Sequence, residues 1–223
     1  MYLVDFFLYI CKIMEDWDNI SFDSEIEDVT HNFGDGSSDD FIKLTNDKIS
    51  TYEVAYENAE QLAKDIQIKK GETIYINLTG KFIFGDFIGA FIQENNLKVK
   101  ELTIVSLAGN ISIYGLLIAL VERGWVDKLN LVLSEYTIAT DKKHNPKAIQ
   151  FLKDSLKKYK EKFELHTGRV HAKLVLIETH QGGKCTMHGS ANLRSSQCIE
   201  QLIIQENAQL YDFNYKFYQS LKV

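Results

Sequence analysis

The stretch that decides the fold is Val170-His-Ala-Lys-Leu-Val-Leu-Ile-Glu178, and His188-Gly-Ser-Ala-Asn-Leu193 follows it one predicted strand later. Successive side chains of a strand point to opposite faces, so His171 and Lys173 project from one face while apolar neighbours pack the other. The pattern therefore predicts a strand over residues 170–178 that aims an imidazole and an ammonium group at one spot.

The second stretch adds hydrogen-bonding groups. Gly189 has no side chain, so another backbone segment or a ligand can approach it closely. Ser190 offers a hydroxyl and Asn192 a carboxamide, and both can donate hydrogen bonds to an oxyanion. An imidazole, an ammonium, a hydroxyl and an amide in one place supply an acid–base group or nucleophile, a charge clamp and orienting donors. These are the groups that phosphoryl chemistry requires.

The two stretches together resemble the signature of the phospholipase D superfamily, which reads His-x-Lys-x-x-x-x-Asp followed by Gly-Ser-x-Asn. His171, Lys173, Ser190 and Asn192 match it position by position. Glu178 stands where the family has Asp, and the spacer before the glycine is longer than in the family. Because Glu178 falls on the opposite strand face from His171, we expect it to be a structural motif position.

The resemblance extends more weakly downstream. The family carries an Asn-x-Glu whose carboxylate orients a histidine, and the nearest equivalent here is Cys198-Ile-Glu200, with Cys in place of Asn. The resemblance thus implies a catalytic set of His171, Lys173, Ser190, Asn192 and Glu200.

The mechanism implied by the resemblance uses two histidines, one that attacks phosphorus to give a phosphohistidine and one that protonates the leaving oxygen. This chain holds one His-x-Lys motif, so the resemblance implies a homodimer with a composite active site. It further implies a hydrolase without metal or cofactor, most simply a nuclease acting on DNA. The alternatives are a catalytically silent dimeric nucleic-acid-binding module of the same fold and, third, a phospholipase or phosphatidyltransferase.

Elements before and after the motif indicate an α/β protein with a mixed, largely parallel β-sheet flanked by helices, which agrees with a phospholipase D-like αβα sandwich. A capping-box pattern at Ser50 and Glu53 predicts a helix over 51–66. The other predicted helices are 84–94, 113–123, one opened by Asn145 and Pro146, and a final aromatic one ending near Leu221. The predicted strands are 73–78, 102–107, 129–133, 163–168, 170–178, 185–189 and 201–205.

Charge divides the 223-residue chain into two parts. Residues 1–50 hold 12 acidic residues against 3 basic ones, and the rest holds 19 against 22. We expect an N-terminal apolar segment with an acidic linker over 1–40 and a phospholipase D-like domain over 41–223. The apolar start is too short and too charged to span a bilayer. Three cysteines without regular spacing favour a reducing compartment, and hence the cytoplasm.

Four further residues are candidates for substrate contact besides Gly189. Arg169 and Arg194 flank the motif and could bind phosphates, although exposed loop arginines are common. Lys81 and Asn110 lie in segments that directly follow predicted strands, where the loops of an open sheet line the binding crevice. Ordinary strand–helix turns are the alternative for both.

A zinc site is a competing interpretation of the same region. Cys185 and His188 have a spacing that suits a ligand pair. The Lys173 ammonium sharing a face with His171 disfavours a metal there. The full set of candidate ligands is His166, His171, His180, Cys185 and His188.

Overall fold

The computed structural model of the protein describes residues 48–56, 58–79, 82–194 and 198–220, with the backbone alone for 48–56. All of these residues belong to one compact unit, residues 44–223. The expected N-terminal segment and acidic linker, residues 1–40, lie outside the described residues.

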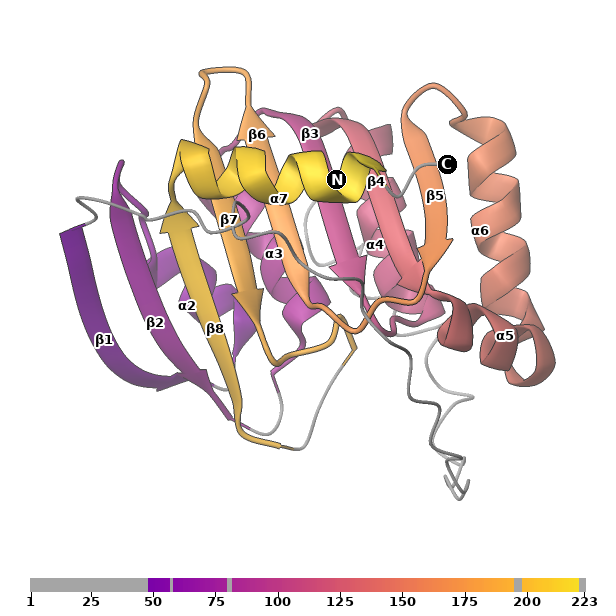
Figure 1. The fold of residues 1–223 in the computed structure, drawn as a ribbon, viewed down its shortest axis with the longest axis horizontal. Helices are drawn as coiled ribbons and strands as arrows, with labels where there is room; N and C mark the ends of the chain where they lie inside the picture. The colour runs from indigo at the N-terminus through magenta and orange to yellow at the C-terminus, as the bar shows by residue number, and fades with distance from the viewer. Residues whose placement is uncertain (1–47, 57, 80–81, 195–197, 221–223) are drawn as a thin grey trace, which may run out of the picture. The chain divides into compact units, whose positions relative to one another are not determined.

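The centre of the fold is an eight-stranded sheet in the order β1-β2-β8-β7-β6-β3-β4-β5 (Figure 1). Antiparallel pairings join β2-β8-β7-β6-β3, and parallel pairings join β1 to β2 and β3 to β4 to β5. The predicted mixed α/β architecture is confirmed, but the sheet is not largely parallel as predicted. Four of the seven pairings between the described strands are antiparallel, and the parallel ones lie on the two flanks. The strands are β1 (Lys48–Tyr56), β2 (Glu72–Leu78), β3 (Val99–Ser106), β4 (Val126–Ser134), β5 (Phe163–Gly168), β6 (Leu174–Thr179), β7 (Lys184–Gly189) and β8 (Glu200–Glu206).

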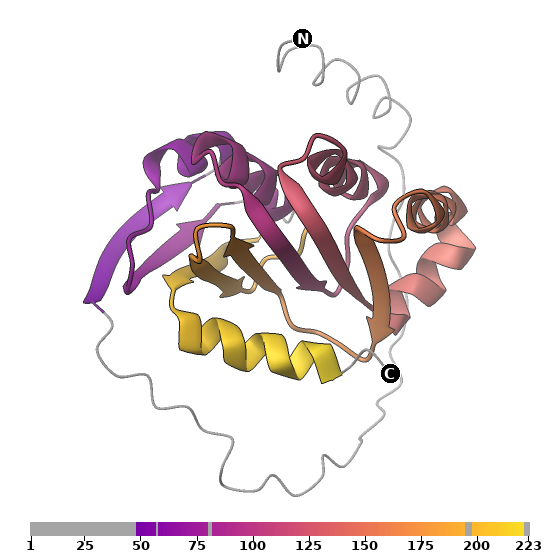
Figure 2. The same ribbon diagram turned by 90° about the horizontal axis from the view of Figure 1, so that it is seen from above.

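Helices cover both faces of the sheet. Figure 2 shows α7 alone on one face and α2, α3, α4 and α6 on the other. None of the helices in the described part of the chain is long and apolar enough to cross a membrane. The helices are α2 (Ala59–Asp65), α3 (Phe84–Glu94), α4 (Ile111–Glu122), α5 (Glu135–His144), α6 (Pro146–Lys158) and α7 (Ala208–Ser220).

Two apolar clusters, one on each face, hold these layers together. The larger includes Phe87 of α3, Leu117 of α4 and Val175 of β6, and the smaller packs Tyr211 of α7 against Leu176 of β6. Val175 and Leu176 are neighbours in the chain, so the alternation of a strand places one in each cluster. Burial on both faces explains why β6 reads as a continuous apolar run.

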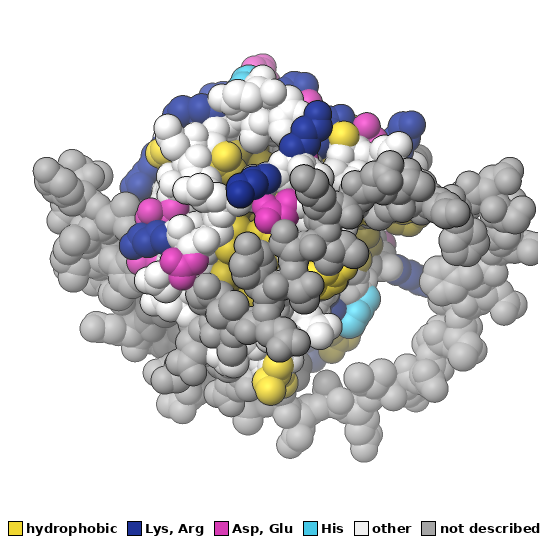
Figure 3. Space-filling model, turned by 90° about the vertical axis from the view of Figure 1, so that its left-hand side faces the viewer, with side chains coloured by type: hydrophobic (Ala, Val, Ile, Leu, Met, Phe, Trp, Pro, Cys, Tyr) yellow, Lys and Arg dark blue, Asp and Glu magenta, His cyan; other side chains and the backbone are white. Residues whose placement is uncertain are grey.

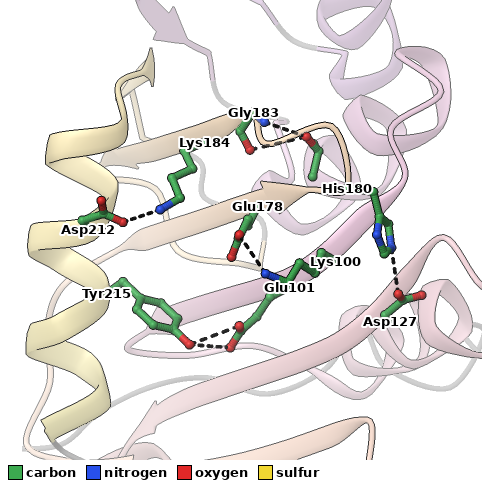
Figure 4. Close-up of polar contacts among 10 residues, drawn as sticks. Lys100, Glu101, Asp127, Glu178, His180, Gly183, Lys184, Asp212 and Tyr215 are labelled. Carbon is green, nitrogen blue, oxygen red and sulfur yellow. Dashed lines mark hydrogen bonds and ion pairs between the residues drawn. The ribbon is translucent and has the colours of Figure 1, made fainter.

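Polar contacts fix α7 to the edge of the sheet where β3 and β7 begin (Figure 4). Lys184 forms an ion pair of 2.5 Å with Asp212, and the Tyr215 hydroxyl donates to the Glu101 carboxylate at 3.1 Å. Burial and the neighbouring Glu101 charge raise the pKa of Tyr215 to about 12. The tyrosine therefore stays protonated and remains a donor.

The predicted helix over 51–66 is wrong in its first half. Residues 48–56 form β1, which pairs with β2, and the helix begins at Ala59. Asn58 is the cap: its side chain accepts hydrogen bonds from the backbone N–H groups of the residues two and three further on, at 2.9 and 3.0 Å. β-branched and aromatic residues in 49–56 favour a strand, and pairing with β2 outweighs the capping-box pattern.

Two further corrections concern the second half of the chain. The strand predicted over 170–178 begins only at Leu174, so residues 170–173 form the connection that leads into β6. Helix α5 was not predicted at all. Its apolar residues follow no helical period, which left no signal for it in the sequence.

Candidate active site at one edge of the sheet

The register of the strands brings distant parts of the motif to one edge of the sheet. Leu174 at the start of β6 pairs with His188 near the end of β7 and with Val105 near the end of β3. Glu200 at the start of β8 pairs with Leu78 at the end of β2. We call this the site edge. It carries the connection 171–173, the end of β7 with the following 189–192, and the start of β8, and it is the lower edge in Figure 1.

His171 and Lys173 contact each other at the site edge. The Lys173 Nζ lies 3.1 Å from His171 Nδ1 and donates to the His171 carbonyl oxygen at 2.9 Å. Because an ammonium group can only donate, Nδ1 is the acceptor and a neutral ring carries its proton on Nε2. The two side chains lie together, but not as neighbours on one strand face as the sequence predicted, because residues 170–173 precede β6.

The charge of Lys173 is sensitive to its surroundings. The side chain is half-buried, and burial lowers the pKa of the ammonium group, whereas the nearby Glu200 carboxylate acts in the opposite direction. Glu200 thus lies close enough to support the positive charge of Lys173, whereas the resemblance implied that its carboxylate orients a histidine. The described contacts include no hydrogen bond between Glu200 and His171.

Gly189 and Ser190 connect three strands at this edge. Gly189 N donates to the Lys173 carbonyl oxygen at 3.4 Å, and Ser190 N donates to the Gln201 carbonyl oxygen at 3.0 Å. The Gln201 N–H in turn donates to Ser190 Oγ at 3.0 Å. A Cβ on Gly189 would lie 1.9 Å from the Gln201 carbonyl oxygen, so only glycine fits. Ser190 Oγ serves as acceptor in this contact, which leaves the hydroxyl proton free to point at an anion.

Asn192 lies in the loop that follows β7, and the next residue, Leu193, holds this loop against the core. The Leu193 side chain is buried, and its carbonyl oxygen accepts from Gly85 N in the first turn of α3 at 2.9 Å. The Asn192 Oδ1 atom is buried and has no hydrogen-bond partner among the described residues. Buried acceptors of this kind are costly and are therefore expected to have a function.

Helix α5 lies between the two arginines that the sequence singled out. Arg169 Nε is 3.9 Å from Glu135 Oε2 at the start of the helix. Near its end, burial raises the pKa of Asp141 while the charge of Arg194 opposes this, so Asp141 lies within electrostatic range of Arg194. Sequence reasoning missed Glu135 and Asp141 because no motif links them to the arginines.

The other candidates for substrate contact differ in position. Asn110 caps α4, where its Oδ1 accepts from Ile113 N at 2.9 Å, so this oxygen is engaged in holding the helix. No hydrogen bond from the Asn110 side-chain nitrogen is found among the described residues. Lys81 lies outside the described residues. Asn110 still follows β3, at the site edge, as the sequence indicated.

Glu178 lies far from the site edge. It occupies the other end of β6 and forms an ion pair of 3.0 Å with Lys100 (Figure 4). Five residues of extended chain separate it from Lys173, about 17 Å at the usual rise of a strand. Its position is that of a structural residue.

The five candidate zinc ligands do not converge. His166 contacts Glu164 on β5, and His180 contacts Asp127 at the edge opposite the site. Cys185 is buried in the larger of the two apolar clusters. His188 faces the other side of the sheet, where it contacts Gln205 at 3.2 Å. No group of three or more metal-ligating residues forms within the described ranges.

No family model matches the chain, and no curated protein sequence matches it either. A solved structure, polyphosphate kinase from Porphyromonas gingivalis, superposes on 67% of the chain with a TM-score of 0.51 at 16% sequence identity. That enzyme is a member of the phospholipase D superfamily. The chain has a phospholipase D-like fold. It spans about a quarter, 26%, of the polyphosphate kinase.

Two other structures with the phospholipase D-like fold are similar to the chain at lower scores. NucT from Helicobacter pylori covers 67% of this chain and is itself covered to 96%, with a TM-score of 0.42 and 14% identity. Phosphatidylserine synthase from Haemophilus influenzae covers 67% of this chain and is covered to 38%, with a TM-score of 0.45 and 12% identity.

Proposed function

We propose that the protein is a phosphodiesterase that hydrolyses DNA, with His171 as the nucleophile. The observation that carries this proposal is the contact between the Lys173 ammonium and the His171 ring, at an edge that also carries the backbone of Gly189 and the side chains of Ser190 and Asn192. A phosphate bound there would meet a cation, a nucleophile and neutral donors together.

In the first step, His171 Nε2 attacks phosphorus and the bond from phosphorus to the leaving oxygen breaks. The leaving oxygen takes a proton from the partner subunit's His171, and a phosphohistidine remains. Water then attacks phosphorus, its proton returns to the partner subunit's His171, and the phosphorus–nitrogen bond breaks to restore the free ring. In each step one bond to phosphorus forms and one breaks, and one proton moves between the partner subunit's His171 and an oxygen atom.

Substrate binding prepares His171 for this role. In the free site Lys173 donates to Nδ1, which leaves the ring proton on Nε2 and blocks attack from that atom. A phosphate oxygen is a stronger partner for an ammonium group than an imidazole nitrogen is. When Lys173 turns to the phosphate, Nδ1 becomes free to hold the proton and Nε2 becomes the nucleophile.

We further propose that the enzyme is a homodimer, because this chemistry needs two histidines and the chain has one motif. Exposed apolar side chains at the site edge support this. Ile199, next to the start of β8, is 78% exposed, and Tyr136 in the first turn of α5 is 61% exposed. A second copy related by a two-fold axis would cover both and bring the two His171 rings together.

The test uses hydrolysis of bis-p-nitrophenyl phosphate and of plasmid DNA in excess EDTA. The Lys173 ammonium already supplies positive charge beside the nucleophile, so wild-type activity should persist on chelation. His171→Asn should lower the rate by several orders of magnitude, since nucleophile and acid are lost together. His180→Asn, at the opposite edge, should retain full activity.

Three results would contradict the proposal. Loss of wild-type activity in EDTA with recovery on adding zinc or magnesium would favour metal chemistry. Equal activity of His171→Asn and wild type would remove His171 from the mechanism. DNA binding by wild type without hydrolysis of either substrate would favour the silent binding module instead.

A further inference from the structure

A group of lysines lies where α5 ends and α6 begins. Lys142 and Lys143 are in the last turn of α5, and Lys147 is in the first turn of α6. All three side chains are exposed. In Figure 1 this corner lies at the same edge of the sheet as the C-terminal ends of β4 and β5, which is the site edge.

Helix α5 joins this corner to the candidate active site. Its first residue, Glu135, contacts Arg169, two residues before His171. Asp141, in its last half, lies within electrostatic range of Arg194, two residues after Asn192. The two acidic residues of α5 thus face the arginines of the site, while the lysines at its end are exposed to solvent.

The charge of this corner is not balanced by neighbours. Lys142, Lys143 and Lys147 form no ion pair with a described residue, whereas Lys158 at the far end of α6 pairs with Glu122 at 3.1 Å. On the side of the molecule that carries β1, basic and acidic side chains are interspersed among the residues drawn in colour (Figure 3). A cluster of cations without ion-pair partners attracts a polyanion more than a mixed surface does.

We propose that Lys142, Lys143 and Lys147, together with Arg169 and Arg194, form a track that binds the phosphates of a nucleic-acid strand as it leaves the active site along α5. This inference rests on the proposed function, because it assigns the path of the substrate. Helix α5 has ten residues and is therefore about 15 Å long. In a B-form duplex, which rises about 3.4 Å per nucleotide along its axis, that length corresponds to about four nucleotides of one strand.

The experiment measures binding of a fluorescent single-stranded 30-mer by anisotropy, with the full chain in the His171→Asn form so that the DNA stays intact. Lys142→Ala, Lys143→Ala and Lys147→Ala are combined in one variant. Its affinity at 50 mM salt should fall at least tenfold. The slope of log affinity against log salt should decrease by about 2, because each lost phosphate contact on a single strand contributes about 0.7.

A matched control removes three lysines from the opposite end of α6 and the loop that follows it. Lys157→Ala, Lys160→Ala and Lys162→Ala change the net charge by the same amount at exposed positions. This variant should bind the 30-mer with nearly wild-type affinity and slope. Circular dichroism should show that both triple variants keep their secondary structure.

The outcomes separate this inference from the proposed function. A selective loss in the α5 variant supports the track. Equal affinity of the α5 variant and its parent, or an equal loss in the control, overturns the track and leaves the proposed enzyme untouched. If the parent binds no 30-mer at any salt while wild type hydrolyses bis-p-nitrophenyl phosphate, both DNA as substrate and the track are wrong, and the phosphodiesterase chemistry stands.

Discussion

Gly189 determines how closely β7 and β8 approach each other at the site edge. Since a Cβ there would overlap the Gln201 carbonyl oxygen, Gly189→Ala must push the strands apart and move Ser190 with them. We expect a loss of stability of about 1–3 kcal/mol. A displacement of about 1 Å at a reacting group costs on the order of 100-fold in rate, and we expect at least this loss.

The matched control for this prediction is Gly115→Ala. Gly115 lies within α4, and a Cβ there meets no atom within 4 Å. Alanine is the better helix former by roughly 0.5–1 kcal/mol, so this variant should be slightly more stable and fully active. Chemical denaturation and steady-state rates compare the two. Similar effects of both substitutions would show that the close approach of β7 and β8 is unimportant.

Glu200 should control the alkaline limit of phosphate binding through Lys173. Burial lowers the pKa of the Lys173 ammonium and the Glu200 charge partly restores it. If the protonated ammonium is the form that binds phosphate, Glu200→Gln should move the alkaline limb of inorganic phosphate binding to lower pH. Glu206→Gln, at the other end of β8, is the control, and an alkaline limb that stays in place in Glu200→Gln would contradict the assignment.

Helix α3 carries an acidic group that weakens the fold at neutral pH. Burial raises the pKa of Asp86 in its first turn to about 6, and the nearby Glu60 charge adds to the effect. The folded protein therefore holds this proton more tightly than the unfolded chain does. The contribution of Asp86 to stability is most favourable below the ordinary pKa of 3.8, falls as the pH rises to about 6, and is constant above that.

Asp86→Asn should consequently stabilise the protein above pH 6, by on the order of 1–3 kcal/mol for a pKa displaced by about two units. The advantage should be much smaller at pH 4, where wild-type Asp86 is protonated in the folded protein and partly protonated in the unfolded chain, whose pKa is 3.8. Urea unfolding at pH 4 and pH 8 measures both values. Glu94→Gln, exposed at the other end of α3, should show little change at either pH. An advantage of Asp86→Asn that is the same at both pH values would exclude burial of the charge as its cause.

The sequence predicted most of these elements correctly where local and tertiary preferences agree. The helix opened by Asn145 and Pro146 is present with the Asn145 side chain as its cap, and the helix predicted over 113–123 is present as α4. The prediction failed over 51–56, where helical spacing of apolar residues competes with β-propensity. Pairing with β2 decides that competition, and the partner strand is not visible in a local window.

The candidate site was predictable to the extent that its residues are close in sequence. His171 and Lys173 lie two residues apart and were expected on one strand face, whereas in the structure they precede β6 and Lys173 folds back to the His171 carbonyl oxygen. The acidic partners of Arg169 and Arg194 come from α5, a separate element joined to the site only by the packing of the sheet. Contacts of that kind depend on strand order, which spacing along the chain does not encode.

Because the proposed active site is shared between two chains, the proposed dimer can be tested through activity. Ile199→Asp places a charge on the exposed apolar residue next to β8 and should separate the proposed dimer, so that activity falls although His171 is intact. Phe217→Asp changes another exposed apolar residue, 57% accessible, on the outer side of α7, and should leave both dimer and activity unchanged. Sedimentation velocity and the hydrolysis rate are measured on the same samples. A fully active Ile199→Asp monomer would contradict the shared site.

Exchange of subunits tests whether two His171 rings act on one phosphate. His171→Asn is similar in size and polar, so mutant chains should fold and pair with intact ones. If nucleophile and acid come from different chains, a dimer with one intact and one mutant chain holds a single imidazole and should turn over far more slowly than wild type. If each chain owns a complete site, the same mixed dimer keeps half of the wild-type rate. Purifying the mixed dimer through two different affinity tags and measuring its rate in EDTA therefore decides between a site shared across a two-fold axis and two independent sites.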